Sequence, residues 1–306
     1  MGSAVRWRMG GLPVEVRCGD RQALRRAALV LRGAIHLEPA EDAVAVSWRL
    51  SPPAGEPDPV PDGPPDEAGS TWLVRRQDTG ETWRRRDLDV ALRVVEFGSV
   101  MALVEGAYGL VTLHGALLER AGRGLLILGP CESGKSTLAA ALWRDGWTLL
   151  GDDVAVADRD GGARPLQRRV SLRHGSRDLL GEALWERVVN APSCSATDEG
   201  YLFHPADLDG TPPPASTRLA GIVFLARRGI RTGPSEVAPI TPAQALLAAA
   251  PYSNVIRRQG LGPALECLQP LVEAAPAFDL GRGPLPSMVA AIEGATMRAT
   301  LPGAMP

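Results

Sequence analysis

The residues from 124 to 153, GLLILGPCESGKSTLAAALWRDGWTLLGDD, decide the fold of this chain. The apolar run Leu125 to Leu128 predicts a buried strand, and the helix formers from Thr137 to Arg144 predict a helix that Asp145-Gly146 would end. A second apolar run, Trp147 to Leu150, predicts another strand that leads into two aspartates. The order strand, loop, helix, strand is typical of an α/β protein.

The loop between the first strand and the helix has the spacing G-x-x-x-x-G-K-[ST], which is typical of loops that surround phosphate groups. Its glycines let consecutive backbone N–H groups curl around an anion, and the helix directs its positive end at the same point. The lysine reaches the β- and γ-phosphates of a nucleotide, and the last hydroxyl can bind Mg²⁺. We therefore expect ATP to be bound by the loop and the residue after it: Gly129, Pro130, Cys131, Glu132, Ser133, Gly134, Lys135, Ser136 and Thr137.

Lys135 is the only lysine in the chain, although lysine and arginine together number 33. A compact ammonium suits a phosphate cradle better than the planar, five-donor guanidinium that the chain uses everywhere else. We expect Lys135 to be a catalytic residue.

Two aspartates, Asp152 and Asp153, follow the second apolar run. We expect that run to be the strand next to the loop-bearing strand, with its acidic end beside the loop. A carboxylate there would complete a Mg²⁺ site together with Ser136. From the residues alone, either aspartate can supply it.

The position of His114 can be predicted from the strand that precedes the loop-bearing strand. Residues 111 to 119 predict one strand, which turns at Ala121-Gly122-Arg123 and continues into the next. In a short antiparallel hairpin, the residue numbers across this ladder would add up to about 243 or 244. His114 would then lie opposite Gly129 or Pro130, so we expect an active-site role for it.

Two groups of arginines leave alternatives open. A hairpin predicted over 71–76 and 81–86 carries Arg75, Arg76, Arg84, Arg85 and Arg86, which form either a solvated strand face or a dock for an acidic peptide. A second group consists of Arg168, Arg169 and Arg173. One of these three could neutralise charge on a transferring phosphate, but the pattern does not choose among them.

The remaining patterns predict two domains, a small α+β domain over 1–105 and a larger one over 106–306, with a mobile proline-rich loop at 51–68. Helices are expected over 21–31, 89–105, 179–189, 242–250, 262–274 and 286–293, and further strands over 14–18, 43–50, 154–157, 166–172, 201–205, 220–226 and 277–280.

Composition argues against several classes of partner. The net charge is -2 and the pI is about 6.1, so no strong field would draw the chain to nucleic acid or to a membrane. The four cysteines are far apart and form no C-x-x-C pair, which indicates free thiols in a reducing compartment. No long apolar run and no signal-peptide core is evident, so a soluble cytoplasmic protein is expected.

The run LHGALLERAGRGLLILGPCESGKSTLAAALWRDGWTLLGDDVAV resembles the catalytic core of HPr kinase/phosphorylase and of its smaller relatives in peptide-tailoring systems. The resemblance covers residues 111 to 157. It implies a P-loop kinase core with a mixed sheet of the HPr kinase and phosphoenolpyruvate-carboxykinase type, Mg-ATP as cofactor and transfer to a serine hydroxyl. It also implies that Asp152 accepts the serine proton, while Asp153 holds Mg²⁺ or orients His114.

This chain departs from the pattern of the family in two respects. Members of the family carry a glutamate where this chain has Thr137, and the later Gly-rich signature of the phosphorylase reaction is missing. We therefore expect an ATP-dependent serine kinase whose acceptor is a peptide or small protein other than HPr. A kinase of a small metabolite such as free serine and a nucleotide-binding regulatory ATPase are the alternatives, and a homo-oligomer stays open.

Overall fold

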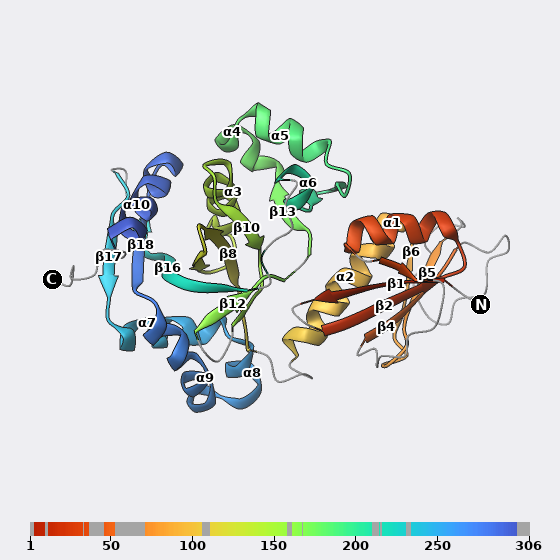
Figure 1. Ribbon diagram of the computed structural model, residues 1–306, viewed down its shortest axis with the longest axis horizontal. Helices are drawn as coiled ribbons and strands as arrows, with labels where there is room; N and C mark the ends of the chain where they lie inside the picture. The colour runs from red at the N-terminus through yellow and green to blue at the C-terminus, as the bar shows by residue number, and fades with distance from the viewer. Residues whose placement is uncertain are drawn as a thin grey trace. The chain divides into compact units, whose positions relative to one another are not determined.

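The computed structural model describes residues 3–9, 12–32, 34–36, 46–52, 71–105, 111–157, 161–166, 168–209, 214, 216–230 and 234–298. The chain divides into two compact units, Met1–Leu103 and Val104–Pro306 (Figure 1). Each unit contains a mixed sheet together with helices, so the chain is a mixed α/β protein.

The N-terminal unit contains a sheet with the strand order β3-β1-β2-β4-β5-β6. The side chain of Asp20 begins its first helix by accepting hydrogen bonds from the backbone N–H groups of Gln22 and Ala23, at 2.7 and 3.0 Å. Its elements are β1 (Ser3–Met9), β2 (Leu12–Cys18), α1 (Arg21–Leu31), β3 (Ala34–His36), β4 (Val46–Ser51), β5 (Trp72–Arg76), β6 (Thr82–Arg85) and α2 (Leu88–Val104).

Trp48 on β4 ties α2 to this sheet. The indole is fully buried and donates a hydrogen bond to the hydroxyl of Ser99 at 3.0 Å. Gly98 on α2 leaves room for it, because a Cβ there would lie 2.4 Å from the indole ring. The hairpin β5–β6 forms as predicted, with Trp72 opposite Arg85.

The C-terminal unit is built on a large mixed sheet. Among the described residues its path runs β10-β8-β9-β16-β12-β11-β7, and β18 pairs with both β16 and β17. Its strands are β7 (Val111–Leu113), β8 (Gly115–Arg120), β9 (Arg123–Leu128), β10 (Thr148–Gly151), β11 (Ala155–Ala157), β12 (Gly162–Arg164), β16 (Thr217–Ile230), β17 (Val237–Ile240) and β18 (Ala277–Arg282). A small antiparallel sheet is formed by β13 (Val170–Arg173), β14 (Ser195–Thr197) and β15 (Gly200–Phe203).

Helices cover both faces of the large sheet, and Figure 1 shows α7, α8 and α9 gathered on one side of this unit. Leu125 and Ile127 of β9 pack into the core that contains α3 and α10, whereas Leu126 and Leu128 pack into the core that contains α7 and α9. The helices are α3 (Lys135–Arg144), α4 (Arg177–Leu180), α5 (Glu182–Val189), α6 (Ala206–Asp209), α7 (Pro242–Ala249), α8 (Asn254–Gln259), α9 (Leu261–Ala274) and α10 (Leu285–Arg298). Complete burial of such side chains stabilises a fold by about 1.5–3 kcal/mol each.

The strand predicted over 111–119 is interrupted at His114. Before the break, β7 pairs with β11; after it, β8 pairs with β9 and β10. The backbone N–H of His114 donates instead to the carbonyl of Tyr252 at 2.8 Å. Gly115 allows a close approach of β8 to β9, because a Cβ there would lie 2.6 Å from the Ile127 carbonyl oxygen.

Two further expectations are wrong in detail. Residues 166–172 do not form one strand: the chain returns earlier, as β12, and pairs again only from Val170 as β13. Residues 179–189 form parts of two helices, α4 and α5, which Gly181 separates with a φ of 85°. The break between α4 and α5 has a local cause, because a residue with a positive φ cannot continue a right-handed helix.

The four cysteines are free thiols. Within the described ranges, no helix has both the length and the apolar character needed to cross a membrane. Most of the proline-rich segment predicted at 51–68 lies outside the described residues.

Candidate active site

The loop from Gly129 to Ser136 joins the carboxyl end of β9 to the first turn of α3, as the sequence predicts. Gly134 precedes the helix with a φ of 93°, a conformation that favours glycine. Gly129 lies against the next strand, where a Cβ would be 2.9 Å from the carbonyl oxygen of Leu225. Glu132 has a φ of 61°, so the loop also contains a non-glycine residue in the left-handed region.

Lys135 lies inside this loop and is only 5% exposed. Its ammonium donates hydrogen bonds to the carbonyl oxygens of Gly129 and Pro130, at 2.9 and 2.8 Å. Burial lowers the pKa of Lys135, while the charges of Asp153, Cys131 and Asp152 act in the opposite direction. The ammonium is therefore held at the loop and lies within electrostatic reach of both aspartates.

The strand that carries the aspartates is not the direct neighbour of β9. Strand β10 pairs with β8, so β8 lies between the two parallel strands. Both strands nevertheless end at the same edge of the sheet, because each runs antiparallel to β8. The acidic pair therefore lies near the phosphate loop, although the expected strand order is wrong.

Asp152 is 2% exposed, and neither carboxylate oxygen has a hydrogen-bond partner among the described residues. Burial, together with the charge of Asp153, raises the pKa of Asp152 to about 6. The Ser136 hydroxyl and the Arg168 guanidinium lower this pKa, but the hydroxyl is not placed for a hydrogen bond. A buried carboxylate without partners is costly unless a proton, a cation or a ligand group comes to it.

Asp153 has a φ of 66°, which non-glycine residues adopt at a cost of order 1–3 kcal/mol. This backbone conformation directs its carbonyl oxygen to His114 Nδ1, at 2.9 Å, and to the Gly115 N–H, at 3.2 Å. Its carboxylate is 41% exposed and lies 3.6 Å from the Arg168 guanidinium.

His114 lies beside the phosphate loop. The ladder between β8 and β9 ends at Gly115 and Leu128, whose numbers add up to the predicted 243. Because a carbonyl oxygen can only accept, Nδ1 carries the ring proton and Nε2 is left as an acceptor, 3.8 Å from Cys131 Sγ. Burial and the nearby Lys135 ammonium lower the pKa of His114, which favours this neutral form.

The donor set suits a hard cation. Magnesium binds carboxylate and hydroxyl oxygens, retains several waters and takes further ligands from phosphates. Asp153 and Ser136 offer such oxygens, and the Asp152 carboxylate, which has no hydrogen-bond partner among the described residues, adds negative charge beside them. The described residues contain no cluster of three His, Cys, Asp or Glu side chains that could hold a metal alone.

Ser133 and Thr137 complete the surroundings of the loop. The Ser133 hydroxyl is buried and has no hydrogen-bond partner within the part of the chain that the structure describes. The Thr137 hydroxyl lies 3.0 Å from the hydroxyl of Ser176, which precedes α4. No sequence signal places Ser176 here, since 39 residues separate the pair.

The second arginine group does not act as a unit. Arg169 is fully buried and donates to the Ser195 hydroxyl at 2.6 Å, so it cannot reach a substrate. Arg173 is exposed and pairs with Glu132 of the phosphate loop at 3.0 Å. Arg168 lies beside Asp153, as described above.

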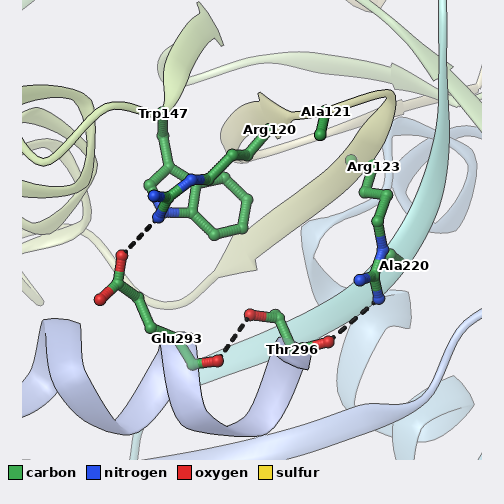
Figure 2. A pocket seen from close by; sticks show the side chains of 8 residues that line it. Arg120, Ala121, Arg123, Trp147, Ala220, Glu293 and Thr296 are labelled. Carbon is green, nitrogen blue, oxygen red and sulfur yellow. Dashed lines mark hydrogen bonds and ion pairs between the residues drawn. The ribbon is translucent and has the colours of Figure 1, made fainter. Parts of the chain in front are cut away.

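The described residues also line a cavity of about 320 Å³ at the opposite end of β9 (Figure 2). Arg120 there pairs with Glu293 at 2.7 Å, and Arg123 donates to the carbonyl of Thr296 at 3.0 Å. The indole of Trp147, which follows α3, lines the same space. None of the site residues expected from the sequence lines it.

A scan against protein-family models found no match, and neither did a search of curated proteins. A search of solved structures found a similarity to the HPr(Ser) kinase/phosphatase from Coxiella burnetii, with 15% identity and a TM-score of 0.33. The match covers 61% of this chain and 90% of that one. Similarity at this level assigns no activity to this chain.

Proposed function

We propose that this protein is an ATP-dependent kinase that transfers the γ-phosphoryl group of ATP to a hydroxyl group. One observation carries the proposal: the buried, unpartnered Asp152 carboxylate lies within electrostatic reach of Lys135 in a phosphate loop. A phosphate cradle alone binds a nucleotide. A carboxylate with a pKa raised to about 6 beside it adds a group that can accept a proton near neutral pH.

The step assigns a task to each side chain. Asp152 accepts the proton of the acceptor hydroxyl as its oxygen attacks the γ-phosphorus. The new O–P bond forms, the bond from phosphorus to the β–γ bridging oxygen breaks, and ADP leaves. Lys135 stabilises negative charge on the phosphates by exchanging its two loop carbonyls for phosphate oxygens.

Asp153 and Ser136 would hold Mg²⁺, which neutralises charge on the β- and γ-phosphates when it is bound. His114 is neutral and donates its only ring proton to the Asp153 carbonyl. We assign it the task of fixing the backbone of the acidic pair.

For the acceptor we propose a serine of a peptide or small protein. The exposed edge at Asp153 leaves the carboxylate end of the site open to solvent.

The alternative acceptors can be separated in one experiment. The protein is incubated with Mg-ATP and, in parallel, with a candidate precursor peptide, HPr or free serine, and the products are weighed by mass spectrometry. We expect a gain of one phosphate on a serine of the peptide, at a rate that falls as salt rises. Phosphorylation of free serine alone would identify a metabolite kinase, and release of phosphate to water alone would identify a regulatory ATPase.

A further inference from the structure

The second arginine group, Arg168, Arg169 and Arg173, follows the acidic pair in the chain, and the surroundings of its members differ. Arg169 is 0% exposed and bound to Ser195, and the exposed Arg173 is neutralised by Glu132 at 3.0 Å and Glu199 at 3.7 Å. Both guanidinium groups therefore already have structural partners. Arg168 is the member of this group that lies in the site.

Arg168 is partly enclosed, with 14% of its side chain exposed. Its Nε donates to the Arg169 carbonyl at 3.3 Å, and Nη2 lies 3.6 Å from the Asp153 carboxylate. That second distance exceeds a hydrogen bond. A guanidinium has five N–H donors, and in the part of the chain that the structure describes Nη1 has no partner.

The charge of Arg168 acts on the proposed reaction centre. It lowers the pKa of both His114 and Asp152. Its guanidinium therefore lies beside Asp153 and within electrostatic reach of Asp152, and its Nη1 has no partner in the described part of the chain. A positive group with free donors, held beside the point where charge develops, is the arrangement that stabilises phosphoryl transfer.

We propose that Arg168 binds the transferring γ-phosphoryl group and stabilises its charge during transfer. This inference rests on the proposed kinase activity. The Asp153 carboxylate lies 3.6 Å from the guanidinium, beyond hydrogen-bond distance. When Mg-ATP is bound, the Asp153 carboxylate would be a ligand of the cation. The Arg168 guanidinium would then donate to phosphate oxygens instead of lying against Asp153, and its planar fork is well suited to phosphate.

The test compares Arg168→Ala, Arg168→Lys and Arg173→Ala, with Arg177→Ala as a control at an exposed arginine that pairs with Glu182 on α5. Phosphate release or transfer is measured at saturating Mg-ATP, and the affinities for ATP and ADP are measured by calorimetry. We expect Arg168→Ala to lower kcat by about 10²–10³-fold and to weaken ATP binding more than ADP binding. Free guanidinium ion should restore part of the lost rate, because it can occupy the space that the side chain leaves.

The outcomes separate this inference from the proposed function. If the wild type turns over no ATP with any acceptor or with water, the proposed function fails, whatever the variants do. If the wild type is active and Arg168→Ala keeps most of its kcat, the inference fails and the kinase assignment stands. An equal loss of ATP and ADP affinity without guanidinium rescue would indicate a structural role, and a larger loss in Arg173→Ala would transfer the assignment to Arg173. Either result would overturn the proposal, and thermal unfolding checks that each variant is folded.

Discussion

The two ends of β9 differ in whether their charged side chains have hydrogen-bond or ion-pair partners. At the carboxyl end, Lys135 is buried against two carbonyl oxygens, and Asp152 is buried with no hydrogen-bond partner among the described residues. At the amino end, the cavity of about 320 Å³ contains Arg120 and Arg123, both of which are already bound, one to a carboxylate and one to a carbonyl (Figure 2).

The difference shows that a concave surface with positive charge does not by itself identify the reactive end of a sheet. The energetic cost of an unsatisfied buried carboxylate must be offset by something that binds there, whereas a paired surface arginine needs nothing further. The comparison leads to variants at both ends, whose effects should differ by orders of magnitude.

Substitution of Lys135 should have the largest effect. We expect Lys135→Ala to abolish nucleotide turnover, a loss of at least about 10³-fold, because no other lysine exists to stabilise the phosphates. Lys135→Arg should fail as well, since the wider guanidinium does not fit between the two loop carbonyls. Phosphate release at saturating Mg-ATP measures both variants, and an arginine variant with most of the wild-type rate would contradict the fit argument.

Removal of the proposed base should have the next largest effect. Asp152→Asn should lower phosphoryl transfer by about 10²-fold or more and leave Mg-ATP binding nearly unchanged. Asp153→Asn should instead weaken the Mg²⁺ dependence of nucleotide binding. Calorimetric titrations with and without Mg²⁺ distinguish the two, and the opposite pattern would exchange the roles of the aspartates.

The raised pKa of Asp152 also predicts how stability depends on pH. The pKa rises from 3.8 to about 6 on folding, so the folded state holds a proton that the unfolded chain has lost between these values. The contribution of Asp152 to the free energy of unfolding is fully present below the lower pKa and is lost as the pH rises through about 6. Asparagine cannot ionise, so Asp152→Asn should stabilise the free protein at pH 8, by on the order of 1 kcal/mol, and change little at pH 4. Thermal unfolding of the variant and the wild type at the two pH values tests this prediction. If the variant differed from the wild type in stability by the same amount at pH 4 and pH 8, the electrostatic explanation would be wrong.

Alkylation of Cys131 tests whether the loop is the reactive end. Its thiol is exposed and lies 3.8 Å from the acceptor nitrogen of His114. We expect iodoacetamide to inactivate the protein and ATP to protect it. Cys131→Ser should resist inactivation, whereas Cys267→Ser, at an exposed thiol on α9, should remain sensitive. If Cys131→Ser were inactivated as fast as the wild type, the sensitive group would lie elsewhere.

The smallest effect is expected at the other end of β9. Arg120→Ala removes a partly exposed ion pair with Glu293, which should cost less than about 1 kcal/mol of stability. Turnover should stay within about twofold of the wild type, because the variant leaves the phosphate loop and the aspartates intact. A loss of turnover as large as that of Asp152→Asn would mean that the two ends are coupled and that the cavity takes part in the reaction.

The local features of the fold were predictable from the sequence. The helix at 21–31 has the predicted bounds, and the short turn after β8 gives the register that places His114 beside the loop. Both features depend on contacts between residues close in the chain, on the Asp20 cap in one case and on a two-residue turn in the other.

Features that depend on distant partners were not predictable. The pattern of residues 111–119 predicts one strand, and its break at His114 arises from pairing with β11, some forty positions later. The position of β8 between β9 and β10 is likewise a choice of partner that periodicity does not record. The same holds for the three arginines: Arg168, Arg169 and Arg173 are alike in sequence, and only the fold buries one, exposes another and directs the third to Asp153.

The two hydrogen bonds of Lys135 bear on how the phosphate loop keeps its shape. The Lys135 ammonium is buried, and the carbonyl oxygens of Gly129 and Pro130 accept its hydrogen bonds inside the loop, as phosphate oxygens would. In the proposed reaction, ATP would exchange one set of oxygen acceptors for another. The loop would then keep its shape through each cycle of binding and release, without folding around the nucleotide each time.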